Sequence, residues 1–62
     1  MTKEEAKARA EEIVYVYCNL GDILYRCKIA GIETHTPKGK QRSRGTLETE
    51  LIEYYTKYYS EN

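Results

Sequence analysis

The sequence predicts an all-α protein with a long N-terminal helix, a basic loop and a shorter, antiparallel C-terminal helix. Three observations support this fold class: a capping signature followed by helix formers, a heptad-like spacing of apolar residues, and a second amphipathic segment after the loop. The chain has 62 residues, which is room for one domain, 1–62. Because a core this small gives marginal stability, we expect the helical hairpin to dimerise into a helical bundle.

The first helix is predicted over about residues 3–30. Thr2 and Glu5 form a capping-box signature, and a run of strong helix formers follows. Apolar residues then recur at alternating spacings of four and three, which is the a/d pattern of a heptad seam. They are Ala6, Ala10, Ile13, Tyr17, Leu20, Leu24 and Cys27. This pattern keeps its phase across Gly21 and favours one helix; the alternative is a three-helix monomer broken at Gly21, with Asp22 as the new cap.

A basic loop is predicted over about residues 31–45, because Gly31 suits the end of a helix and no apolar periodicity follows it. Thr46 is a fair N-cap for the second helix, about residues 46–60. One face of this helix continues the apolar pattern. We therefore assign the core or dimer seam to Ile13, Tyr17, Leu20, Leu24, Cys27, Leu47, Leu51, Tyr54 and Tyr58.

Charge is distributed unevenly along a chain whose formal net charge is zero. Residues 1–33 carry −1, residues 34–46 carry +4 and residues 47–62 carry −3. The cations of the middle segment are predicted to contact phosphates of DNA or RNA, with a slope of log K against log salt of about −3.6 if all four bind. They are Lys38, Lys40, Arg42 and Arg44. Other interpretations stay open: a solvated loop, a loop that neutralises acids such as Glu48 and Glu50, or a loop that docks on an acidic protein.

Tyrosine is the main compositional bias, with seven Tyr and no Phe or Trp. A tyrosine ring buries much area yet keeps a polar tip, which suits interfaces. Tyr54 and Tyr58 continue the leucine stripe and are predicted to be core, although rings in this segment could also stack on bases. Tyr55 and Tyr59 are predicted to be exposed and to bind a partner.

The sequence contains no catalytic or metal-binding pattern. His35 stands between two threonines without an acid or nucleophile at a spacing typical of a catalytic triad. Cys18 and Cys27 would lie about 13.5 Å apart along one continuous helix, which excludes a disulfide, and with a single His they make a poor zinc set. We predict no enzyme, no cofactor and no metal. The charged N-terminal segment and the absence of an apolar run of about 18 residues predict a cytoplasmic protein that neither carries a signal peptide nor crosses a membrane.

The plan of helix, extended basic loop and helix, with "AGI" closing the first helix and "ELIEYY" in the second, is loosely similar to that of SAP-like nucleic-acid modules. The loop is longer here and few residues match, so no family is assigned. The favoured function is a non-catalytic, homodimeric nucleic-acid-binding or regulatory protein. The alternative is a protein-protein adaptor or inhibitor, such as a phage or mobile-element product that binds a host protein through its Tyr-rich second helix and acidic faces.

Overall fold

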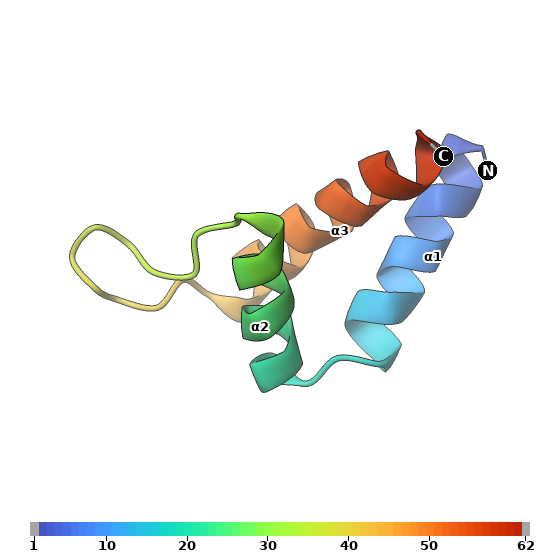
Figure 1. Ribbon diagram of the computed structural model, residues 1–62. Coiled ribbons are helices and arrows are strands. Elements are labelled where there is room, and N and C mark those ends of the chain that lie inside the picture. Colours follow the sequence, from blue (N-terminus) through green and yellow to red (C-terminus); the bar gives the residue numbers. More distant parts are fainter. Residues whose placement is uncertain (1, 62) are drawn as a thin grey trace.

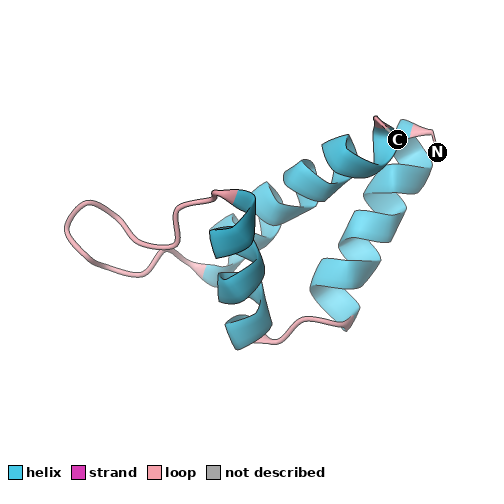
Figure 2. Cartoon of the chain, viewed as in Figure 1, coloured by secondary structure: helices cyan, strands magenta, loops and turns pink. Residues whose placement is uncertain are grey.

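A computed structural model describes residues 2–61, and within them the chain is all-α with three helices and no strand (Figures 1 and 2). The helices are α1 (Lys3–Val16), α2 (Leu20–Ala30) and α3 (Arg44–Ser60). Both α1 and α2 pack on α3, and α1 makes the more extensive contact. The start of α1 lies beside the end of α3, so these two helices are antiparallel (Figure 1).

The single helix predicted over residues 3–30 is wrong, because the chain breaks between Val16 and Leu20. A reciprocal capping box starts α2: the Asn19 side chain accepts a hydrogen bond from the Asp22 N–H at 2.8 Å. The Asp22 carboxylate accepts one from the Asn19 N–H at 3.2 Å. The alternative of a three-helix chain fits this arrangement, but the break precedes Gly21, and Asn19 rather than Asp22 is the cap.

This cap gives a first prediction. Replacing Asn19 by Ala removes a side-chain acceptor from the start of α2 and lowers the free energy of unfolding by about 1 kcal/mol. If a continuous helix were the preferred state, Ala would raise stability instead, since it has the best helix propensity. Urea denaturation followed by circular dichroism measures the sign, with Glu4→Ala as a control in a helix that keeps its own cap.

The core lies where α1 and α2 meet α3. On α3, Leu47 and Leu51 are fully buried and Ile52 is nearly so. Small residues of α1, Ala6 and Ala10, are also fully buried, and side chains of this size let the two helix backbones approach closely. The other buried apolar residues are Val14, Cys18, Ile23 and Cys27.

The predicted seam is only partly buried. Cys27, Leu47 and Leu51 are in the core, and Ile13 and Leu24 pack against it. Tyr17 and Leu20 flank the break and are exposed. The core assignment of Tyr54 and Tyr58 is wrong for the single chain, because these rings are 40% and 54% exposed. Figure 1 shows that α2 lies against the first half of α3, which carries Leu47 and Leu51, whereas Tyr54 and Tyr58 belong to the second half.

The helix ends on either side of the loop have clear local causes. Gly31 adopts a left-handed conformation with φ of 79°, and the Ile32 N–H donates to the Cys27 carbonyl at 2.8 Å. This is the predicted glycine-terminated helix end, and Ile32 packs against the core as expected. At the other side, α3 begins two residues earlier than predicted, because Ser43 rather than Thr46 is the N-cap.

Candidate functional site

The basic loop is an ordered ribbon that projects away from the helices (Figure 1). His35 and Gln41 form an antiparallel bridge across its stem. Nearer the tip, the Thr36 N–H donates to the Lys40 carbonyl at 2.8 Å. Gly39 turns the chain with φ of 83°, a value that few side-chain-bearing residues adopt. The tip of this ribbon therefore holds Lys38 and Lys40 away from the helical body.

The four predicted phosphate ligands divide into two pairs. Lys38 and Lys40 are exposed at the tip, and neither has an ion pair with another residue in the described range 2–61. Arg42 instead forms an ion pair with Glu50 and donates to the Glu33 carbonyl at 2.8 Å. Two cations, not four, are left unpaired on this loop.

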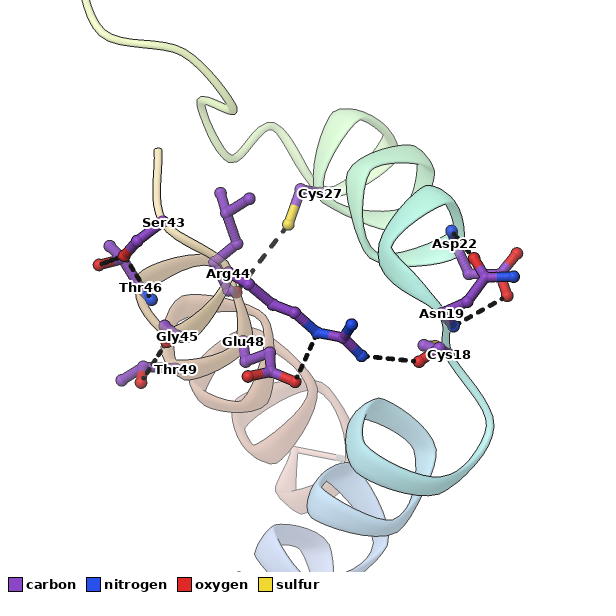
Figure 3. Close-up of polar contacts among 11 residues, drawn as sticks. Cys18, Asn19, Asp22, Cys27, Ser43, Arg44, Gly45, Thr46, Glu48 and Thr49 are labelled. Atoms are coloured by element: carbon purple, nitrogen blue, oxygen red, sulfur yellow. Dashed lines mark hydrogen bonds and ion pairs between the residues drawn. The ribbon is translucent and has the colours of Figure 1, made fainter. Parts of the chain in front are cut away.

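Arg44 has a structural role at the start of α3. Its Nε contacts the Glu48 carboxylate at 3.4 Å, and its Nη2 donates to the Cys18 carbonyl at 3.4 Å (Figure 3). The guanidinium thus connects the segment between α1 and α2 to the first turn of α3. The contacts of Arg42 and Arg44 agree with the alternative interpretation, in which cations of the loop neutralise neighbouring acids.

A groove between α2 and α3 was not anticipated from the sequence. It has a volume of about 410 Å³ and is lined by Asp22, Tyr25, Arg26, Ile29 and Tyr55. Two of its lining residues, Tyr25 and Ile29, are large and 66% and 67% exposed. They lie four residues apart and off the heptad stripe. This i, i+4 pair of large side chains was the signal in the sequence that could have indicated the groove.

Arg26 and Tyr55 fix the wall of this groove. The Arg26 Nη1 donates to the Tyr55 hydroxyl at 3.0 Å, and the guanidinium lies 5.9 Å from the ring centroid. The hydrogen bond to Tyr55 raises the pKa of Arg26, with desolvation opposing it, so the group stays charged. Tyr55 then contacts Tyr54 and Tyr59 at centroid distances of 5.5 and 6.1 Å.

These rings form one continuous surface, because Tyr59 also contacts Tyr58 at 5.4 Å. We call this surface the tyrosine face; its members are Tyr25, Ile29, Tyr54, Tyr55, Tyr58 and Tyr59. The structure reverses the predicted roles within α3. Tyr54 and Tyr58 are exposed, whereas Tyr55 and Tyr59, predicted to be exposed, are half-buried.

Both cysteines are free and buried, and Cys27 has no exposed surface. Its Sγ lies 4.0 Å from the Leu47 carbonyl oxygen, to which the thiol donates (Figure 3). Burial raises the pKa of the Cys27 thiol, Glu50 raises it further and Arg42 acts in the opposite direction. The neutral thiol is therefore the folded form at pH 7. The exclusion of a disulfide assumed one continuous helix, whereas Cys18 lies between α1 and α2 and Cys27 lies in α2.

This shift predicts a loss of stability at alkaline pH. In the unfolded chain Cys27 ionises at about pH 8.5, whereas the folded chain keeps the proton to higher pH. Its contribution to stability is complete below that pH and is lost as the pH rises towards the folded pKa. Urea midpoints measured between pH 7 and pH 10 should fall less in Cys27→Ala than in the wild type, and parallel curves would contradict the prediction.

The other sequence candidates give no further site. The exposed His35 Nδ1 lies 2.8 Å from the Thr34 hydroxyl oxygen. Within residues 2–61 there is no group of three or more His, Cys, Asp or Glu positioned to hold a metal ion. No helix of the described chain is sufficiently long and apolar to cross a membrane. The sequence matches no family model, and no curated protein or solved structure is significantly similar to it.

Proposed function

We propose that the protein is a non-catalytic binding module that recognises another protein through its tyrosine face. The observation that carries this proposal is the exposure of Tyr25 and Ile29, each about two-thirds accessible, beside a groove with an aromatic wall. Aromatic and large apolar side chains are enriched at the centres of protein interfaces, and a soluble chain rarely exposes them together. The partner presents an apolar side chain that enters this groove.

The groove also has the rigidity that recognition requires. Arg26 and Tyr55 hold each other by a hydrogen bond and a cation–π contact. Tyr55 is further held by its ring contacts with Tyr54 and Tyr59. Because these side chains are ordered before binding, little conformational entropy is lost when a partner docks. This arrangement supports the adaptor or inhibitor function over a purely electrostatic one.

The test compares two variants that replace side chains of similar exposure. In Tyr25→Ala/Ile29→Ala the centre of the face is removed, whereas Val16→Ala removes an apolar side chain that is also 67% exposed but lies outside the face. We expect a protein partner captured from the native host by crosslinking to bind the first variant at least about tenfold more weakly, since central interface residues each contribute more than 1 kcal/mol. Equal affinities of both variants would refute the proposal.

A second candidate function, contact with nucleic-acid phosphates, is supported by the projecting tip of the loop. Only Lys38 and Lys40 are free of ion pairs there, so the expected slope of log K against log salt is about −1.8, half of that for four cations. Affinity for a mixed-sequence duplex or single strand then falls about tenfold between 50 and 200 mM salt.

Fluorescence anisotropy measures this slope directly. Lys38→Glu/Lys40→Glu should abolish binding, whereas Lys28→Glu, a change of exposed charge on α2, should leave most of it. A slope near −3.6 would instead show that Arg42 and Arg44 leave their carboxylates to bind phosphate. No salt-sensitive affinity for DNA or RNA would eliminate this candidate.

A further inference from the structure

A second groove runs along the contact between α1 and α3, on a different part of the surface from the tyrosine face. Two hollows of about 540 and 270 Å³ share Lys7, Ile52 and Glu53 in their walls, so they form one continuous groove. The α1 side of the groove carries Lys3, Lys7, Glu11 and Tyr15. These residues are spaced by four and follow one another along one side of the helix.

The charges of this groove change sign along its length. Lys3 and Lys7 of α1 meet Lys57 of α3 at one end. Glu11 and Tyr15 line the other end, and Lys7 and Glu53 line both ends. None of these charged groups has an ion pair with another residue of the described chain, although Glu11 is half-buried. Along the α1 side of the groove, two lysines are therefore followed by an acid, and none of the three has an ion pair with another residue of the range 2–61.

A surface with this polarity is complementary to itself. In a two-fold dimer with antiparallel helices, the partner's helix runs in the opposite direction. The order of charges along the partner's helix is therefore reversed relative to that of the first helix. If the axis passes midway between Lys7 and Glu11, each Lys7 faces the partner's Glu11. Lys3 then faces the partner's Tyr15, whose ring can hold the cation and the lysine stem.

We propose that this groove is the docking surface for a second copy of the chain in a two-fold dimer with antiparallel α1 helices. Docking pairs Lys7 of each copy with Glu11 of the other and covers Tyr15, which is 56% exposed in the single chain. The proposal does not rest on the proposed function, because the tyrosine face and this groove share no residue.

A charge exchange between two variants tests the proposal. In Lys7→Glu both facing positions are acidic, and in Glu11→Lys both are basic, so each variant alone should dimerise at least about tenfold more weakly than the wild type. An equimolar mixture of the two variants pairs an acidic stripe with a basic one and should recover a dimer. Sedimentation equilibrium measures the mass of each sample, and a fluorescent label on one variant identifies the heterodimer.

The mixing experiment distinguishes a change at the dimer interface from a change within α1 of a single chain. Lys7 and Glu11 are four residues apart, so either change also alters α1 itself, but mixing cannot repair a helix inside one chain. Lys28→Glu is the control for charge alone and should dimerise like the wild type. A wild type that is monomeric at 500 μM, single variants that dimerise normally, or a mixture that stays monomeric would each overturn the proposal. Single variants that dimerise normally would direct the search for the dimer contact to the tyrosine face.

Discussion

Replacing Leu51 by Ala is expected to remove about 3 kcal/mol from the free energy of unfolding. Leu51 has no exposed surface and belongs to the core cluster that joins the three helices. A buried leucine-to-alanine change loses the transfer free energy of the side chain and leaves a cavity, for a total of about 2 to 5 kcal/mol. A domain of this length has a total stability of only about 3 to 9 kcal/mol, so this single change removes about a third of it or more.

Leu20→Ala is the matched control, because it is the same substitution at a leucine that is 37% exposed. Its expected cost is about 1 kcal/mol, since much of that side chain already contacts water. Chemical denaturation of both variants, followed by circular dichroism at 222 nm and by tyrosine fluorescence, gives the comparison. Equal losses in the two variants would show that α3 does not hold the core at Leu51.

Replacing Ala10 by Leu is expected to destabilise the protein by about 1 to 3 kcal/mol, although the change adds apolar volume. Ala10 is fully buried where α1 packs on α3, so a longer side chain has no space unless the helices separate. Separation would also widen the groove that contains Ile52. The same change at Ala8, which is exposed two residues earlier on α1, should have almost no effect.

Thermal unfolding distinguishes the two variants in which leucine replaces alanine. A cost of about 1 kcal/mol lowers the midpoint of a domain of this size by about 4 to 8 °C, so Ala10→Leu should melt well below Ala8→Leu. An Ala10→Leu protein that melts at the wild-type temperature would show that α1 does not approach α3 closely. An increase in stability would show instead that a cavity exists beside Ala10.

The two surfaces proposed for binding have a combined consequence. The dimer groove lies between α1 and α3, whereas the tyrosine face lies between α2 and α3. A dimer formed through the first surface leaves two copies of the second surface accessible. If both proposals hold, such a dimer would bind a multimeric partner at two points, and its apparent affinity would exceed that of one face because the second contact is intramolecular.

Local chemistry was sufficient to predict several parts of this protein from its sequence. The capping box of Thr2 and Glu5, the glycine end at Gly31 with its Ile32 contact, and the all-α fold class are all observed. The two helix ends depend on hydrogen bonds between residues within about one turn of one another, so their signals are local in the sequence. The break before α2 has a local signal too, since Asn19 and Asp22 have capping-box spacing, but the heptad phase across Gly21 favours a continuous helix.

Tertiary structure decided which surfaces are free. The ion pair of Arg42 with Glu50 joins the loop to α3, and the bond from Arg44 to the Cys18 carbonyl joins segments distant in sequence; these contacts leave two free cations where four were predicted. The exposure of Tyr54 and Tyr58 follows from the position of α2, which lies against the first half of α3 (Figure 1). The sequence alone determined helix ends and apolar stripes because neighbouring residues make them. Which stripe is covered depends on where another helix lies, and that is set by packing across the whole chain.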